Sequence, residues 1–178
     1  MRGSQRLPAA SAHAEAPWYA ELEFANDGAV SSMDHSKQPV AAAALRDIIM
    51  HEVLMPVRWG DMDAYQHVNN TVYFRYMEQC RLEWFGKLGF DTVDVDVVPV
   101  LVEASCRFLR AVTFPADVRV TLRVTDIGPK VVETVHDLFV GDALHASGVC
   151  KLLWMSRAAN RAVPLPDSVR ARLLAFRP

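Results

Sequence analysis

Residues 57–77 read VRWGDMDAYQHVNNTVYFRYM, and the fold prediction starts from this stretch. A strand-like segment ends at Trp59. A polar turn then begins at Gly60, and its functional side chains are Asp61, Asp63, Gln66 and His67. An amphipathic helix opens at Asn69 and Asn70. Two carboxylates, an imidazole and two amides therefore lie between a strand and a helix N-terminus. Such a terminus carries unpaired N–H groups and a partial positive charge, so it can hold an anion or stabilise an oxyanion.

The helix is predicted from Thr71 to about Leu88. Its apolar residues recur at three- and four-residue steps, which makes a single stripe of Tyr73, Met77, Cys80, Trp84 and Leu88. Asn70 is the predicted N-cap residue and Gly89 the predicted stop. Because little of this helix is polar, we expect an antiparallel sheet to curl around it.

The pattern changes to a period of two from residue 97 onward. Strands are predicted at 97–109, 118–125, 131–140 and 143–155, and a first strand at 48–59 precedes the polar turn. Gly148 is expected to mark a β-bulge, and a short final helix is expected through Leu174. A strand, a long helix and four strands with short links indicate the α+β class, an antiparallel sheet of about five strands on one helix.

The domain is predicted to span residues 46–178, and residues 1–45 are predicted to be an N-terminal extension. The extension is rich in Ala, Ser, Pro and Gly and shows no lasting periodicity, so we expect it to be flexible or docked at the periphery. Its arginines, Arg2 and Arg6, suggest a mitochondrial targeting segment, but its acidic residues argue against one. The predicted location is the cytoplasm, with the mitochondrion as the alternative.

Composition excludes several classes of protein. The formal net charge of −2 offers no basic footprint for nucleic acid, and no apolar run approaches the roughly 20 residues of a membrane span. The three cysteines, Cys80, Cys106 and Cys150, are isolated, which favours free thiols in a reducing compartment. Without metal-ligand spacing, neither a metal site nor a resident cofactor is predicted.

The central stretch resembles the Asp-x-Asp-x-x-x-His-Val-Asn-Asn-x-x-Tyr signature of the hotdog-fold acyl-CoA thioesterases, the 4-hydroxybenzoyl-CoA thioesterase-like family. The matching residues are Asp61, Asp63, His67, Val68, Asn69, Asn70 and Tyr73. Within the helix the likeness continues through Glu78, Arg81, Trp84 and Leu88-Gly89. The resemblance implies a hotdog fold, in which an antiparallel β-sheet wraps around a long central α-helix.

Thioester hydrolysis needs a carboxylate that attacks the carbonyl or activates water, and a donor that holds the oxyanion. The resemblance implies that Asp63 is the catalytic acid, either as nucleophile or as general base; the alternative is a turn aspartate that caps local N–H groups. Asp61 is expected to brace the turn or to pair with Arg58 or Arg75. His67 either orients water and moves a proton or only links the loop to backbone groups.

Three residues are predicted to bind substrate: Asn70, Tyr73 and Gln66. Asn70 is expected to cap the helix and to contact substrate or the catalytic carboxylate, while Tyr73 belongs either to the core or to the pocket wall. The oxyanion donor is expected among the backbone N–H groups of residues 67–70. Aromatic-CoA members of the family carry glycine at the position of Gln66, so this residue favours an aliphatic acyl group.

The predicted function is hydrolysis of an acyl-CoA, with an aliphatic acyl group, to the free acid and CoA, which makes the CoA thioester the substrate. Hydrolysis of acyl-carrier-protein thioesters is an alternative, and a non-catalytic acyl-CoA-binding module is another. Family members pair their sheets edge to edge and place active sites between subunits. The resemblance therefore implies a homodimer or homotetramer, which would also cover an exposed edge strand.

Overall fold

The computed structural model describes residues 48–90 and 95–175. The extension predicted for residues 1–45 lies outside the described residues. The elements of the described chain are β1 Ile49–Pro56, the 3-10 turn η3 Trp59–Asp61, α2 Asn70–Lys87, β2 Val97–Phe108, β3 Asp117–Ile127, β4 Val131–Val140, β5 Ala143–Ser156, the short β6 Arg161–Ala162 and α3 Asp167–Ala175.

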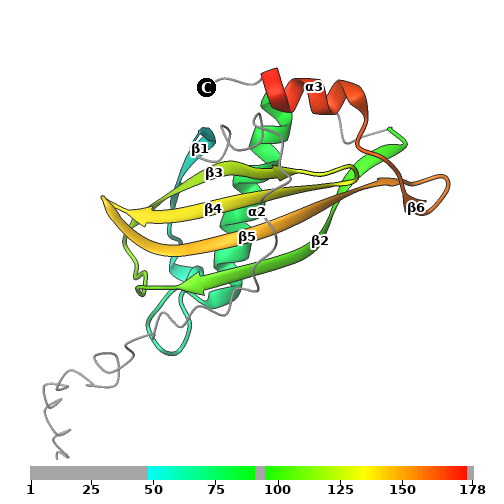
Figure 1. Ribbon diagram of the computed structural model, residues 1–178. Coiled ribbons are helices and arrows are strands. Elements are labelled where there is room, and N and C mark those ends of the chain that lie inside the picture. The colour runs from blue at the N-terminus through cyan, green and yellow to red at the C-terminus, as the bar shows by residue number, and fades with distance from the viewer. Residues whose placement is uncertain (1–47, 91–94, 176–178) are drawn as a thin grey trace, which may run out of the picture. The chain divides into compact units, whose positions relative to one another are not determined.

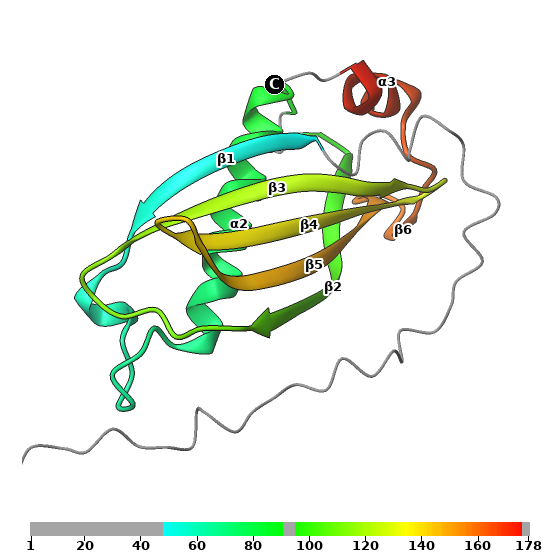
Figure 2. The same ribbon diagram turned by 60° about the vertical axis from the view of Figure 1, so that its left-hand side comes forward.

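The strands form one antiparallel sheet in the order β1-β3-β4-β5-β2, and β6 pairs with the end of β5. Figures 1 and 2 show this sheet curving across α2. The order leaves β1 and β2 at the two edges. The α+β hotdog prediction is confirmed: one long helix lies in the curve of an antiparallel sheet.

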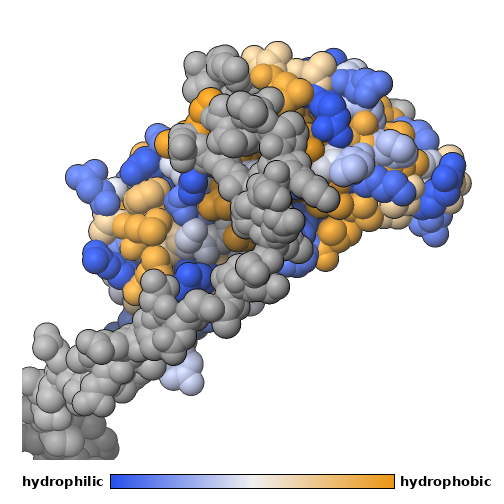
Figure 3. Space-filling model, in the orientation of Figure 1, coloured by the Kyte–Doolittle hydropathy of each residue, from blue (hydrophilic) through white to orange (hydrophobic). Residues whose placement is uncertain are grey.

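The core lies between α2 and the concave face of the sheet. Its largest fully buried side chains include Trp84 and Met77 of α2, Leu138 of β4, and Leu152 and Trp154 of β5. Burial alternates residue by residue along β4 and β5, as the period-two pattern predicts for a sheet with one covered face. The other face is more polar, and Figure 3 shows hydrophilic and hydrophobic residues intermixed on the side of the molecule that it presents.

The last helix, α3, closes one end of the core and confirms the short helix predicted there. Val169 and Leu173 of α3 are buried. The Arg172 guanidinium donates hydrogen bonds to the carbonyl oxygens of Leu88 (3.2 Å) and Gly89 (3.0 Å). A cation at these carbonyls is favourable, because the C-terminus of α2 carries a partial negative charge.

Two local predictions were wrong. The N-cap residue of α2 is Asn69, because its side chain accepts a hydrogen bond from the Thr71 N–H; Asn70 is the first helical residue. Gly148 marks no bulge, since it pairs in register with Cys106 and His136. Its lack of a side chain has another cause: a Cβ at this position would overlap the Met77 sulfur, so glycine lets α2 pack directly on β5.

Candidate functional site

The signature loop joins η3 to the N-terminus of α2, at the end of the sheet where β1 and β2 finish. Two backbone hydrogen bonds fix it to the segment between β2 and β3. Val57 N–H donates to the Ala116 carbonyl and Val68 N–H to the Val112 carbonyl, each at 2.8 Å. The loop is therefore attached at both of its ends to the segment that connects β2 and β3, which holds its functional groups in place.

The loop from Asp63 to His67 is closed by its own backbone. Asp63 N–H donates to the His67 carbonyl at 2.9 Å, and Gln66 N–H donates to the Asp63 carbonyl at 3.0 Å. Gln66 has a φ of 63°, in the left-handed region that glycine enters most easily. The backbone at Gln66 therefore adopts a conformation that glycine would adopt with less strain.

The Asp63 carboxylate is half-buried and held by two donors. One oxygen accepts the Tyr65 backbone N–H at 2.8 Å. The other accepts the Asn69 side-chain amide at 3.3 Å. These contacts fix the carboxylate beside the helix N-terminus, and its partial exposure leaves it open to a reactant.

Asp61 has a different role. It braces the turn, which is one of the two alternatives predicted for it. Its Oδ2 accepts the Arg58 backbone N–H at 2.8 Å and the Tyr76 hydroxyl at 3.0 Å. Burial, followed by this hydrogen bond, raises the pKa of Tyr76, so the phenol remains a proton donor to Asp61. Among the ion pairs of residues 48–90 and 95–175, none joins Asp61 to Arg58 or Arg75.

Asn69 links the helix cap to the candidate catalytic acid, a role that the sequence analysis missed. Its Oδ1 accepts from the Thr71 N–H at 3.0 Å, while its amide nitrogen donates to Asp63. The neighbouring Asn70 is exposed. The Asn70 backbone N–H has no hydrogen-bond partner within the described chain, as expected for the first turn of a helix. It is a free donor beside the Asp63 loop.

The remaining predicted residues lie on either side of this loop. Gln66 is exposed and His67 is half-buried at its end. Tyr73 is only 2% exposed and packs edge to face against Phe108, with ring centroids 5.1 Å apart. Burial raises the pKa of Tyr73. The structure therefore brings Asp63, Gln66, His67 and Asn69 together on one loop and places Tyr73 beneath it in the core.

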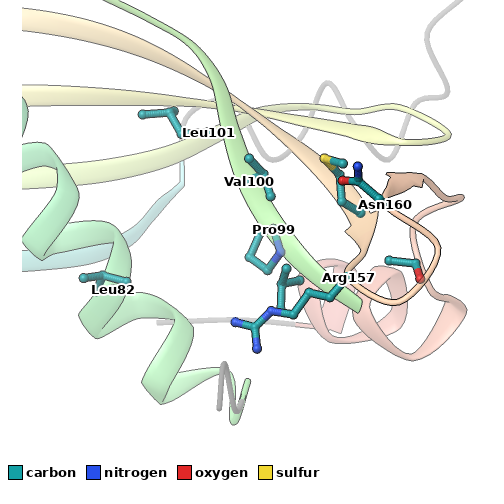
Figure 4. A pocket seen from close by; sticks show the side chains of 9 residues that line it. Leu82, Pro99, Val100, Leu101, Arg157 and Asn160 are labelled. Carbon is teal, nitrogen blue, oxygen red and sulfur yellow. The ribbon is translucent and has the colours of Figure 1, made fainter. Parts of the chain in front are cut away.

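Two larger cavities flank α2. A groove of about 730 Å³ runs between β1 and α2, and Arg58, Asp61 and Arg75 are among the side chains that line it. A second cavity of about 570 Å³ lies on the other side of the helix, in Figure 4. Leu82 comes from α2, Val100 and its neighbours from β2, and Arg157 from the turn after β5. Both cavities open to solvent beside α2.

The described residues were also searched for metal-binding groups and for helices that could span a membrane. Residues 48–90 and 95–175 contain no group of three or more His, Cys, Asp or Glu side chains suited to a metal ion. The absence of a resident cofactor remains a prediction. Neither helix in the described part of the chain is long and apolar enough to cross a membrane.

Comparison with known proteins places these observations in a family. A family profile described as the thioesterase-like superfamily matches residues 57–173. The PA2801 protein of Pseudomonas aeruginosa, a candidate thioesterase, is 40% identical in sequence to this chain. The match covers 69% of this chain and 97% of the PA2801 chain, and the two structures superpose with a TM-score of 0.65. A protein from Bacillus subtilis, YsmA, is 26% identical over 66% of this chain and 81% of its own length.

Two further similar structures have a named activity or a bound ligand. The BH1999 gentisyl-coenzyme A thioesterase is 26% identical, with a TM-score of 0.63 over 68% of this chain and 98% of its own. A thioesterase from Thermus thermophilus, solved with coenzyme A and zinc, is 27% identical, with a TM-score of 0.66 over 74% of this chain and 98% of its own. The resemblance read from the signature is confirmed.

Proposed function

The chain belongs to the thioesterase-like superfamily, and we propose that it hydrolyses an aliphatic acyl-CoA to the free acid and CoA, with Asp63 as the catalytic carboxylate. The observation that carries the proposal is the Asp63 carboxylate, half-buried and held between Tyr65 and Asn69 at the N-terminus of α2. The relatives that act on gentisyl-CoA or bind coenzyme A support a CoA thioester. Arg58 and Arg75 in the neighbouring groove offer cations for its phosphates.

In the proposed reaction Asp63 takes a proton from water as the water oxygen attacks the thioester carbonyl carbon. The carbonyl oxygen becomes an oxyanion, and the free Asn70 N–H at the positive end of α2 donates to it. Collapse of the intermediate breaks the C–S bond and expels the CoA thiolate, which is protonated by Asp63 or His67. In the nucleophilic alternative Asp63 attacks the carbon itself, and water then hydrolyses the mixed anhydride.

The test is CoA release measured with a thiol reagent across a panel of straight-chain, benzoyl and phenylacetyl CoA thioesters. We expect the highest kcat/KM on a straight-chain member, because Gln66 adds bulk at the position where aromatic-CoA relatives carry glycine. Best turnover on an aromatic thioester would overturn the aliphatic assignment. Binding of the esters without CoA release would establish that the protein is a non-catalytic acyl-CoA-binding module. Turnover confined to carrier-protein thioesters would establish that it is an acyl-carrier-protein thioesterase.

We also propose that the protein works as a homodimer through β2. This strand of 12 residues lies at a sheet edge, and its apolar side chains Val100, Leu101 and Val102 are 36%, 43% and 52% exposed. An exposed edge of this length invites pairing with another chain. Antiparallel β2 pairing about a twofold axis would bring the C-terminal end of one β2, with the Asp63 loop attached beside it, to the Figure 4 cavity of the other copy.

The dimer proposal predicts that Val102→Glu, at a β2 side chain that lines none of the cavities described here, produces a monomer with greatly reduced turnover, because a buried unpaired carboxylate would oppose pairing. Leu54→Glu is the matched control: Leu54 is 62% exposed on the opposite edge strand, β1, and this variant is expected to remain dimeric. Sedimentation velocity of both variants beside the wild type measures the outcome. A fully active wild-type monomer would contradict the proposal.

A further inference from the structure

A cluster of polar side chains lies in the middle of the core, away from the Asp63 loop. It consists of Arg81 of α2, His136 and Thr134 of β4, and Cys150 of β5. Arg81 is 6% exposed, His136 and Thr134 are 0% exposed and Cys150 is 1% exposed. Arg81 donates to the Cys150 sulfur at 3.6 Å, and Thr134 donates to the Cys150 carbonyl at 3.5 Å. The mechanism above uses none of these groups.

The cluster carries one positive charge that its own members leave uncompensated. Arginine stays protonated, whereas burial lowers the pKa of His136 to about 3 and raises the pKa of Cys150. Both are therefore neutral at physiological pH. No carboxylate among the described residues forms an ion pair with Arg81, and its one side-chain hydrogen bond goes to a thiol, a weak acceptor. A buried charge in this state favours an incoming anion.

The guanidinium also borders empty space. Arg81 lines a cavity of about 140 Å³ between α2 and β2, together with Met77, Glu78, Leu101 and Cys150. Besides the Arg81 guanidinium, two exposed side chains of α2, Arg75 and Glu78, supply charged groups at the rim, and the rest of the lining is apolar apart from the Cys150 thiol. An anion that entered here would meet a fixed guanidinium in a poorly solvated site, where a charge-assisted hydrogen bond is strong.

We propose that Arg81 binds a carboxylate at the far end of the acyl group, so that the preferred substrate is an ω-carboxyacyl-CoA. This inference rests on the proposed thioesterase function and names its substrate class. Side chains on a helix point toward its N-terminus, so the guanidinium lies near the level of Met77. The helix rises about 1.5 Å per residue, which puts Met77 about 10 Å from Asn70, a span of about eight carbons.

The test compares two CoA esters of equal chain length, octanoyl-CoA and its eight-carbon ω-carboxy counterpart. For the wild type we expect kcat/KM to be at least about tenfold higher on the ω-carboxy ester. Arg81→Met keeps the length and apolar stem of the side chain and should remove this preference while octanoyl-CoA turnover stays measurable. Glu78→Gln should move the preference the other way, because it removes the negative charge that opposes the carboxylate at the rim.

A binding arm separates this proposal from the catalytic one. Calorimetric Kd values for the two esters in Asp63→Asn report the carboxylate preference even where turnover is lost. If no ester is hydrolysed by the wild type yet the preference persists in binding, the thioesterase proposal fails and the Arg81 site stands. If the two esters bind with equal Kd values, and if the ratio of their kcat/KM values is the same in wild type and Arg81→Met, the Arg81 site is overturned and the thioesterase proposal is unaffected.

A competing explanation is that a carboxylate of a second copy pairs with Arg81. In that case Arg81→Met and Glu78→Gln would both weaken self-association in sedimentation velocity, and neither would change the ratio between the two esters. That result would overturn the substrate assignment. Thermal unfolding of Arg81→Met checks that the variant is folded, and we expect its Tm to equal or exceed that of the wild type, because the substitution removes an unpaired buried charge.

Discussion

Asp63→Asn is expected to reduce kcat on the best acyl-CoA by about 10²- to 10⁴-fold, the range that a positioned general base contributes. Asparagine keeps the size of the side chain, and its oxygen can still accept the Tyr65 N–H. It loses the negative charge that attacks the carbonyl or takes the proton from water. Its NH2 group cannot accept from the Asn69 amide, so that hydrogen bond is lost and Tm should fall modestly, while KM should change little. Single-turnover kinetics and substrate titration measure the two effects separately.

Two other acids serve as comparisons for Asp63. Asp142 is an exposed carboxylate in the turn between β4 and β5, and Asp142→Asn should leave kcat unchanged. Asp61→Asn should lower stability more than Asp63→Asn, because Asp61 accepts from both the Arg58 N–H and the Tyr76 hydroxyl. A variant series in which Asp61→Asn abolishes turnover while Asp63→Asn retains it would reverse the assignment of the catalytic acid.

The sequence predicted the architecture because the two periodicities stand apart in this chain. The stripe on α2 and the alternation in β3, β4 and β5 each place apolar side chains on one face of their element. The α+β fold class could therefore be predicted from local patterns. Spacing could not decide which asparagine caps the helix, because Asn69 and Asn70 are equally good cap residues. The choice depends on Asp63 as well, since Asn69 binds both the Thr71 N–H and the acid.

The buried cluster around Arg81 lay beyond sequence reasoning for a physical reason. His136 sits on β4 and Cys150 on β5, and only the pairing of these strands brings both under α2. Arg81 falls at a helical position that is polar in the sequence pattern, where a surface location is the default expectation. The absence of a side chain at Gly148 is what brings α2 close to this part of the sheet. A contact of this kind depends on tertiary packing and leaves no periodic signal.

The same cluster should make the protein sensitive to acid. Burial, followed by the nearby Arg81 charge, lowers the pKa of His136 from 6.5 to about 3, while Asp137 offsets part of this shift. The unfolded chain binds a proton below pH about 6.5, but the folded chain resists it until about 3. The contribution of neutral His136 to the free energy of unfolding is therefore fully present above pH 6.5 and is lost as the pH falls toward 3. At about 1.4 kcal/mol per pH unit, this loss approaches about 5 kcal/mol.

His136→Leu should remove most of this loss. Both ring nitrogens of His136 lack a hydrogen-bond partner in the described chain, so leucine should match or exceed the wild-type stability at pH 7. Urea unfolding between pH 7.5 and 4 at a fixed protein concentration measures the slope. His145→Gln is the control, because His145 is a half-exposed residue elsewhere on β5, and it should keep the wild-type slope. Since a loss of about 5 kcal/mol is comparable to the total stability of many domains, equal slopes in His136→Leu and wild type would show that another group dominates acid unfolding.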